Sequence, residues 1–380
     1  MNQLAVHEEF WRNRRKNFPN LIATEFGIAE LRRGCIVFGA AVLGKKVISG
    51  LQSLGIAIKA VLDNDPSKHG ASYMGVNISK PADFVNTDLP VVIASKFVCD
   101  IDQQLQALNV RTRIPHYVLS ILHPEVFPNE LHRNAIALIE AEWPRVQEAY
   151  GLLSDELSRK TFFQLIHFRH TLQPADLPHL VADQYFIDMF WQPCDWETYV
   201  DVGAYCGDTL QEYLTRCKGT FRKYLAIEPD KVNYRQLLSI IPTEYAHKID
   251  TWNLAAGVRE GKHAFHAVGG LDSRFVAVDS IADAEIINTV ALDDLLRDED
   301  ACTIKMDVEG WESQVLEGAI EIIRERQPRL AVCVYHRPDH LWSLLLQITQ
   351  INRNYRFFLR HHESEIYGTV LYCISEGASK

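Results

Sequence analysis

Polar side chains follow several apolar segments in the second half of the sequence. Asp201, Glu228, Asn253, Asp307 and His336 each stand at or near the end of a run that is typical of a buried strand. In doubly wound sheets, ligands bind beyond the carboxyl ends of the strands, where the strand order reverses. We therefore expect these five side chains to converge on one site.

A glycine-containing segment begins at the first of these residues. It reads Asp201-Val-Gly-Ala-Tyr-Cys-Gly-Asp-Thr209, and a second apolar run ends in Glu228-Pro-Asp230. A nucleoside-binding site usually consists of a strand, a glycine turn, a helix and an acid after the next strand. The acid accepts hydrogen bonds from the ribose hydroxyls. Gly203 and Gly207 let the backbone bend and approach a ligand. The spacing departs from G-x-G-x-x-G, so a diphosphate is less expected than an uncharged linker.

Four motifs in order make the sequence similar to a known family. They are D-V-G-A-Y-x-G-D-T, I-E-P-D, I-K-M-D-V-E-G at 304–310 and V-Y-H-R-P at 334–338. Over roughly residues 183–375 the chain resembles the FkbM-type S-adenosylmethionine-dependent methyltransferases. The resemblance implies a seven-stranded class I methyltransferase sheet and O-methylation, commonly of sugar hydroxyls.

With that cofactor, each polar residue has an expected role. Asp201 accepts from the cofactor's ammonium group or fixes the glycine turn, and Asn253 reads the adenine edge or is a turn residue. Asp208 and Thr209 cap the helix that faces the methionine part, with N-capping alone as the alternative. The predicted cofactor-binding residues are Asp201, Gly203, Tyr205, Gly207, Asp208, Thr209, Glu228, Asn253 and Asp307.

Methyl transfer to a hydroxyl requires a group that takes up the proton. We predict His336, Glu309 and Asp307 as catalytic residues, with His336 or Glu309 as the base, since a histidine of ordinary pKa is neutral near pH 7. Two carboxylates two residues apart also suit a divalent cation. We predict no metal ligands, because the sequence identifies too few oxygen ligands and Pro338 separates His336 from His340.

The order of apolar runs predicts an α/β protein with two Rossmann-like doubly wound domains. We expect an N-terminal domain over 1–120, a helical connector over 121–182 and the methyltransferase domain over 183–380. Expected N-terminal strands cover 35–38, 56–62, 90–94 and 116–119, with a helix after the first. Expected C-terminal strands cover 198–202, 224–228, 249–254, 302–307 and 329–335, followed by a hairpin of 355–359 and 369–374, and the helices cover 208–217, 230–239, 311–326 and 338–349.

The N-terminal part also allows other functions. Gly39, Gly44 and the strand-end Asp63 suit a dinucleotide, but Ala41 replaces the middle glycine that permits approach of a pyrophosphate. Binding of a nucleotide sugar or of NAD, with an oxidoreductase activity, is one alternative to the methyltransferase. A non-catalytic interaction protein on a methyltransferase fold is the other.

The composition restricts the classes of binding partner that we expect. The formal charge of −10 argues against nucleic acid, and no apolar run approaches the roughly 20 residues that span a bilayer. The first residues lack the pattern of a secretory signal, so we expect a cytoplasmic protein. Its 8 scattered cysteines are typical of reduced core residues. A small molecule or glycan precursor is the expected partner, and the sequence leaves homo-oligomerisation open.

Overall fold

The computed structural model describes residues 3–15, 17–266, 274–275 and 285–375. The chain divides into two compact units, each made of several segments. Unit 1 comprises Met1–Trp143, Lys160–Leu180 and Glu363–Tyr367, and unit 2 comprises Pro144–Arg159, Val181–His362 and Gly368–Lys380.

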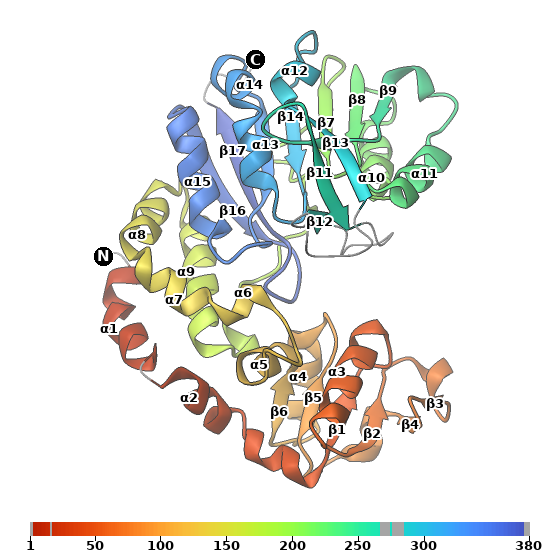
Figure 1. Cartoon of the computed structure of the whole chain (residues 1–380), viewed down its shortest axis with the longest axis vertical. Coiled ribbons are helices and arrows are strands. Elements are labelled where there is room, and N and C mark those ends of the chain that lie inside the picture. Colours follow the sequence, from red (N-terminus) through yellow and green to blue (C-terminus); the bar gives the residue numbers. More distant parts are fainter. Residues whose placement is uncertain (1–2, 16, 267–273, 276–284, 376–380) are drawn as a thin grey trace. The chain divides into compact units, whose positions relative to one another are not determined.

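Unit 1 contains a sheet with the order β3-β4-β2-β1-β5-β6 (Figure 1). All its pairings are parallel except that of β3 with β4. The central strands β1 and β5 are short, apolar and buried, as expected of a sheet whose two faces are covered. The bounds of the strands in this sheet are β1 Cys35–Phe38, β2 Ile58–Leu62, β3 Ser72–Tyr73, β4 Val76–Ser79, β5 Val91–Ile93 and β6 Arg113–Pro115.

One predicted strand of this unit is wrong. Residues 116–119 begin the helix α5 (His116–Leu122), and the strand β6 ends just before it at Pro115. The run from Tyr117 to Leu122 is apolar apart from Ser120, and such a short run has no period that separates strand from helix. Proline, which lacks an N–H, is tolerated at the edge of a sheet, and β6 is an edge strand.

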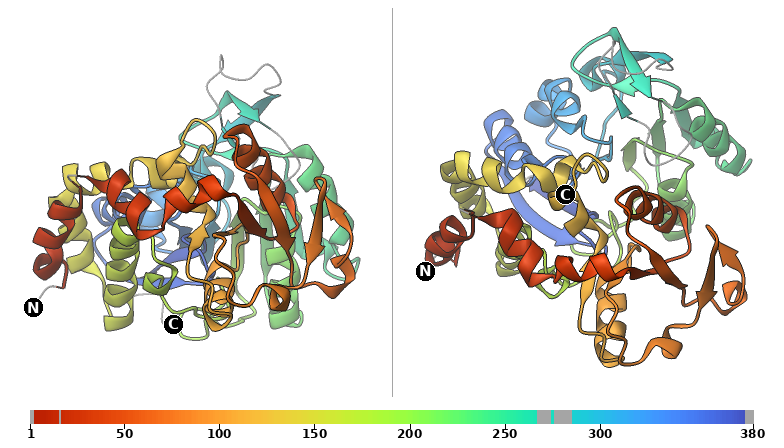
Figure 2. Two further views of the ribbon diagram at one scale, coloured as in Figure 1. Left: turned by 90° about the horizontal axis from the view of Figure 1, so that it is seen from below. Right: turned by 60° about the horizontal axis from the view of Figure 1, so that its bottom comes forward.

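The other helices of the first half include those of the segment that we expected to be a helical connector. Figure 2 shows the red α1 beside the yellow-green α9, where the rings of Trp11 and His170 stack 5.2 Å apart. Residues of α9 belong to both units. The bounds are α1 Gln3–Arg15, α2 Phe18–Glu25, α3 Val42–Ser53, α4 Val98–Ala107, α6 Glu130–Arg133, α7 Ala135–Ala141, α8 Trp143–Leu152 and α9 Glu156–Thr171.

Unit 2 contains a seven-stranded sheet with the order β16-β17-β15-β14-β7-β8-β9 (Figure 1). Five strands pair in parallel, and β17 runs antiparallel to both of its neighbours, β15 and β16. The order reverses between β7 and β14. The prediction of an α/β fold with a seven-stranded C-terminal sheet is confirmed. The strands are β7 Thr198–Val202, β8 Lys223–Ile227, β9 Ile249–Trp252, β14 Thr303–Met306, β15 Arg329–Cys333, β16 Tyr355–His361 and β17 Thr369–Ser375.

The helices of unit 2 follow the expected alternation with one break. The helix expected over 311–326 is divided at Gly318, where a Cβ would lie 1.9 Å from the carbonyl oxygen of Gly257. Glycine is therefore needed for this close approach, and the helix restarts after it. The bounds are α10 Asp208–Cys217, α11 Lys231–Ile240, α12 Leu292–Leu295, α13 Glu312–Glu317, α14 Ile320–Glu325 and α15 His340–Ile351.

A second, smaller sheet lies between β9 and β14 in the chain and was not predicted. Its order is β10-β13-β11-β12, and the strands are β10 Ala255–Ala256, β11 Gly261–His266, β12 Arg274–Phe275 and β13 Glu285–Val290. Among the described residues of this segment, a small cluster of Ala255, Phe265 and Ile287 forms the core of the sheet. Strands that bury so few apolar side chains leave a weak pattern in the sequence.

Aromatic side chains form much of the core beside the seven-stranded sheet. Tyr199 of β7 packs on Phe186 and on Tyr213 of α10, with ring centroids 5.8 and 4.9 Å apart. All three are fully buried. No described helix is long and apolar enough to cross a membrane.

A buried ion pair joins the two strands at which the order reverses. Lys305 of β14 is opposite Asp201 of β7 in the sheet register, and Lys305 Nζ lies 2.8 Å from Asp201 Oδ1. The side chains are 3% and 0% exposed. Lys305 Nζ also donates to the carbonyl of Gly203 at 2.6 Å, and Tyr224 donates to Asp201 Oδ2 at 2.6 Å. The pair thus fixes the start of the glycine turn.

We expect Lys305→Met to lower the free energy of unfolding of unit 2 by about 3–5 kcal/mol, because Asp201 would be buried without its partner. Urea unfolding followed by fluorescence measures the loss. Lys231→Met is the matched control: its Nζ lies 2.6 Å from Glu285, but the side chain is 56% exposed, so we expect a loss below about 1 kcal/mol. Equal losses in the two variants would contradict this assignment.

Candidate active site

The turn after β7 has an unusual backbone. Gly203 and Gly207 have φ angles of 83° and 87°, and Tyr205 between them has a φ of 47°. A left-handed conformation is strained for a tyrosine and is typical of functional loops. A Cβ at Gly203 would lie 1.9 Å from the carbonyl oxygen of Asp307. A side chain at position 203 would therefore clash with the loop after β14, and this close contact requires glycine.

Glu228 connects the strand β8 to this turn. Its carboxylate accepts hydrogen bonds from the backbone N–H groups of Tyr205 and Asp230, both at 2.9 Å. Burial raises the pKa of Glu228 to about 7, against the effect of these two donors. A carboxylate offers about four acceptor positions, so these two partners leave capacity for further donors such as ribose hydroxyls.

Asp201 and Asn253 support the loops through contacts with other residues of the protein. Asp201 is fully buried, and its carboxylate contacts Lys305 and Tyr224. Burial opposes the charge on Lys305, but the carboxylates of Asp201 and Asp307 outweigh it and raise the pKa of Lys305 above its usual value. Asn253 donates to the carbonyls of Glu228 and Pro229 at 2.9 and 3.0 Å. Of the expected roles, fixing the turn matches these contacts of Asp201.

The helix α10 begins without a side-chain cap. Its N-cap residue is Gly207, and Asp208 and Thr209 are the first two residues of the helix. The Thr209 N–H donates a hydrogen bond to the Asp208 carboxylate, at 2.9 Å. The expected capping by Asp208 and Thr209 is therefore wrong, because the left-handed Gly207 occupies the cap position.

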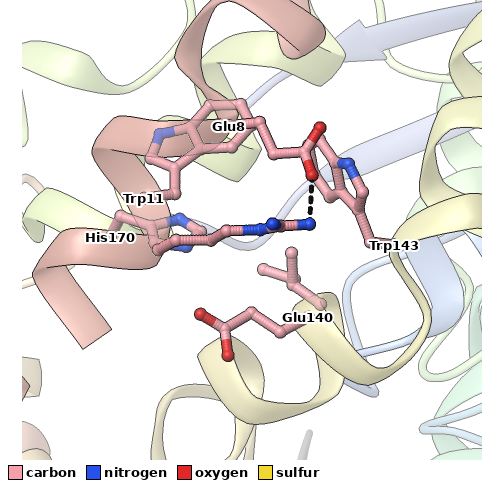
Figure 3. A pocket seen from close by; sticks show the side chains of 7 residues that line it. Glu8, Trp11, Glu140, Trp143 and His170 are labelled. Carbon is pink, nitrogen blue, oxygen red and sulfur yellow. Dashed lines mark hydrogen bonds and ion pairs between the residues drawn. The ribbon is translucent and has the colours of Figure 1, made fainter. Parts of the chain in front are cut away.

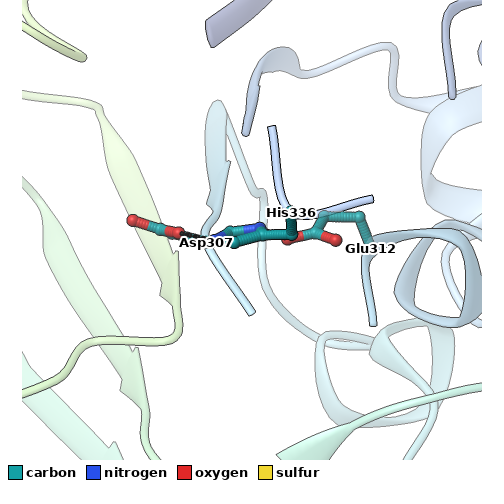
Figure 4. A group of neighbouring side chains, drawn as sticks. All are labelled: Asp307, Glu312 and His336. Carbon is teal, nitrogen blue, oxygen red and sulfur yellow. Dashed lines mark hydrogen bonds and ion pairs between the residues drawn. The ribbon is translucent and has the colours of Figure 1, made fainter. Parts of the chain in front are cut away.

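Asp307, His336 and Glu312 lie in a row, with the imidazole between the two carboxylates (Figure 4). His336 Nδ1 is 2.6 Å from Glu312 Oε1, and His336 Nε2 is 3.3 Å from Asp307 Oδ1 and 3.6 Å from Glu309 Oε2. Glu312 is fully buried, whereas Glu309 is 37% exposed. The predicted catalytic residues His336, Glu309 and Asp307 thus meet at one point, at the ends of β14 and β15.

More groups that the sequence analysis missed complete this cluster. Tyr185 and Tyr335 donate to the two oxygens of Asp307 at 2.9 and 3.2 Å. His340 Nδ1 lies 3.2 Å from the second oxygen of Glu312. Tyr185 precedes the motifs along the chain, so no local signal placed it here. The spacing of Glu312 to His336 and His340 could have suggested a shared partner.

The carboxylates change the titration of the imidazole. Burial alone would lower the pKa of His336, but Glu312, Asp307 and Glu309 outweigh it and raise that pKa to about 9. Burial also opposes ionisation of Glu312, yet the two imidazoles hold its pKa well below the usual range. The expectation that His336 is neutral near pH 7 is therefore wrong, because it ignored the three carboxylates around the ring.

The same cluster has a composition that can bind metal ions. Donor atoms of Asp307, Glu312 and His336 all lie within 4.8 Å of one another. However, the 2.6 Å contact between His336 Nδ1 and Glu312 Oε1 is a hydrogen bond between the two groups. This contact suits a cluster of acid–base groups.

A polar cavity of about 490 Å³ borders the cluster. Its walls include Gly310, Arg337, His340, Ser343 and Gln347. Gly310 directly follows Glu309, and its φ of 94° is in the region that favours glycine. Amide, hydroxyl and guanidinium groups dominate this wall, so the cavity suits a ligand rich in hydrogen-bonding groups.

The expected dinucleotide residues of unit 1 also lie around a loop. A Cβ at Gly39 would lie 2.3 Å from the carbonyl oxygen of Ala94, and one at Gly44 would lie 1.9 Å from that of Gly39. Asp63 accepts from the Ala40 N–H at 2.9 Å and pairs with Lys68 at 2.9 Å. These glycines permit close packing of the protein on itself.

We expect Glu312→Gln to lower the pKa of His336 by at least about one unit, because its largest stabilising charge is lost. NMR titration of histidine ring carbons measures this value, with His336→Gln to assign the signal. Glu317→Gln, an exposed position on the same helix, is the control. The raised pKa of folded His336 also stabilises the protein fully below about pH 6.5, and this contribution is lost as the pH rises through 9. An unchanged His336 titration in Glu312→Gln would refute the assignment.

Comparisons with known proteins agree with the geometry. Residues 201–359 match the family model described as the methyltransferase FkbM domain. The chain is similar in structure to the methyltransferase FkbM from Methylobacillus flagellatus KT, with a TM-score of 0.69 and 22% identity over 94% of this chain and 98% of that chain. It is also similar to an rRNA methylase from Streptococcus thermophilus, with a TM-score of 0.31 and 13% identity over 48% of this chain and 88% of that chain.

A comparison with curated proteins gave no match. The family match begins at Asp201 and ends at Leu359, so it includes the glycine turn, Glu228 and the His336 cluster. The resemblance that the four sequence motifs indicated is therefore confirmed. Residues 201–359 form a methyltransferase domain of the FkbM family.

Proposed function

We propose that this protein transfers a methyl group from S-adenosylmethionine to a hydroxyl of a sugar or glycoconjugate precursor. The observation that carries the proposal is the meeting of His336, Glu309 and Asp307 at the ends of β14 and β15, beside the strand that leads into the glycine turn. A glycan-precursor partner and a cytoplasmic location stay predictions, as does the assignment of catalysis to residues 183–380.

The residues of the turn suit the cofactor. Glu228 would hold the ribose, since its buried carboxylate has two backbone donors among the described residues and its pKa is raised to about 7. Hydroxyl donors would compensate for its burial. Gly203, Tyr205 and Gly207 would shape the turn around the cofactor, with Asp208, Thr209 and Asn253 beside them. When bound, S-adenosylmethionine supplies an electrophilic methyl group.

The acceptor must lose its proton as its oxygen forms the new bond. His336 is protonated near pH 7, so Glu309 is the better base at that pH, because its carboxylate is the most exposed of the cluster. The imidazolium 3.6 Å away stabilises this carboxylate, and Glu312 orients the ring through Nδ1. Asp307, which holds the hydroxyls of Tyr185 and Tyr335, positions His336.

The neighbouring cavity supports a hydroxylated acceptor. The cavity has a volume of about 490 Å³ and a polar wall. This wall includes Gly310, one residue after the proposed base. Several hydroxyls of one acceptor could bond to Arg337, Ser343 and Gln347 while another is presented to Glu309. An apolar acceptor would leave these polar groups without partners, which is costly.

We expect S-adenosylhomocysteine to bind the intact protein, and Glu228→Gln to weaken this binding at least about tenfold, because a carboxylate accepts stronger hydrogen bonds than an amide. Isothermal calorimetry measures both affinities. Glu244→Gln, at an exposed position after the next helix, should bind as the unchanged protein does. If the unchanged protein fails to bind S-adenosylhomocysteine, the proposed function is wrong.

We expect Glu309→Gln to lower methyl transfer by about 10²–10⁴-fold without weakening S-adenosylhomocysteine binding, because a general base typically contributes this much. The assay supplies labelled S-adenosylmethionine with a panel of free and nucleotide-linked sugars and identifies the methylated atom by mass spectrometry and NMR. Glu317→Gln serves as the control. Methylation of amines alone, or an active Glu309→Gln, would exclude the proposed acceptor or the proposed base, respectively.

A further inference from the structure

The polar cavity beside the proposed base has two arginines in its wall. They are Arg337, which follows β15, and Arg145 of α8, and both residues are exposed. Every residue of the wall belongs to unit 2. A ligand that enters the cavity can therefore reach two guanidinium groups that come from separate elements of one compact unit.

Arg337 lies next to the loop that carries the proposed base. A Cβ at Gly310 would lie 3.5 Å from Arg337 Cγ and 3.8 Å from Arg337 Cδ, so the stem of the arginine passes the residue that follows Glu309. The Arg337 side chain is 60% exposed, and its Nε lies 3.7 Å from Asp339 Oδ1. This distance is too long for a hydrogen bond. The N–H groups of the guanidinium are thus accessible to a ligand.

The charges around this cavity differ from those of a cavity in unit 1. Figure 3 shows the latter, which has a volume of about 610 Å³ and lies among helices. There Arg12 forms an ion pair with Glu8, and Glu140 adds a second carboxylate. Among its described residues, the wall in unit 2 has two guanidinium groups and the one carboxylate of Asp339. An anion is therefore attracted to the cavity in unit 2 and repelled from the one in unit 1.

The geometry of guanidinium groups favours phosphate among anions. An arginine binds phosphate through two parallel N–H···O bonds, and the oxygens that remain can accept from a second arginine. Ser343 and Gln350 of α15 add uncharged donors to the same wall. A neutral hydroxyl group would also bond to an arginine, but it would leave the positive charge without a counter-charge. The wall thus suits a phosphate group better than hydroxyls alone.

We propose that the acceptor carries a phosphate group, which Arg337 and Arg145 bind, so that the substrate is a phosphorylated or nucleotide-linked sugar. This inference rests on the proposed function, because it names a group on the same acceptor. The phosphate takes no part in methyl transfer. Its binding beside Gly310 holds the sugar where a hydroxyl can reach Glu309, one residue earlier in the chain.

The test is a calorimetric titration of the full chain, with and without S-adenosylhomocysteine, using free hexoses, hexose phosphates and uridine diphosphate hexoses. We expect at least one phosphorylated ligand to bind about tenfold more tightly than its free hexose, because bonds between charged groups are stronger. Added salt should weaken this preference, since it screens exposed charges. The tighter of the two phosphorylated classes identifies the source of the phosphate.

Three variants assign the binding to the two arginines. Arg337→Gln keeps a polar side chain but removes the charge, so we expect it to weaken binding of the phosphorylated ligand about tenfold and to leave binding of S-adenosylhomocysteine unchanged. Arg145→Gln should act in the same direction. Arg324→Gln is the matched control, because Arg324 is an exposed residue of α14 in unit 2 that lies outside the cavity wall.

Two results would overturn the proposal: free and phosphorylated hexoses bind equally, or Arg337→Gln and Arg324→Gln weaken binding alike. Circular dichroism establishes that Arg337→Gln is folded, and if it is not, Arg145→Gln decides in its place. Binding of phosphorylated sugars by a protein that does not bind S-adenosylhomocysteine would refute the methyltransferase function and keep the phosphate site. Methylation of free sugars without any preference for phosphate would refute this inference alone.

Discussion

The candidate active site depends on the buried contact between Lys305 and Asp201. These residues are neighbours across β14 and β7, the strands between which the order of the sheet reverses. Burying two charges is costly, and excellent geometry with additional hydrogen bonds is needed to offset it. Here Tyr224 and the Gly203 carbonyl supply those bonds. The position of the glycine turn relative to the loop of Asp307 and Glu309 therefore follows from one electrostatic contact.

The same requirement explains how several carboxylates gather beside that turn in a chain of charge −10. Each acid has its own donors: Lys305 for Asp201, His336 for Glu312, and two tyrosine hydroxyls for Asp307. Because His336 is the cation within reach of Glu309 as well, its protonation keeps the cluster stable near neutral pH. Acid–base chemistry at this site is thus a property of the whole cluster.

The sequence predicted the strands and the strand-end residues of unit 2 because both are local patterns. The apolar runs that contain Asp201 or precede Glu228 and His336 are strands. The partners Lys305, Tyr185 and Glu312 were missed because each contact spans a long stretch of chain or lies inside a strand. Local pattern also failed at His116, where an apolar run forms a helix, and in the small sheet of β10 to β13, which buries few side chains.

The two units share one hydrogen-bonding arrangement, but the pKa of the acid in it shifts in opposite directions. In each, an acid after the second strand accepts from a backbone N–H of the loop after the first: Asp63 from Ala40, and Glu228 from Tyr205, both at 2.9 Å. Burial opposes ionisation of Asp63, but the Asp65 N–H, Lys68 and the Ala40 N–H outweigh it and lower its pKa. Glu228 accepts hydrogen bonds from two backbone N–H groups, and burial raises its pKa. A carboxylate already neutralised by a lysine gains little from ribose hydroxyls, whereas a buried one without a lysine gains much. This difference, and not the glycine pattern, favours unit 2 as the nucleoside site.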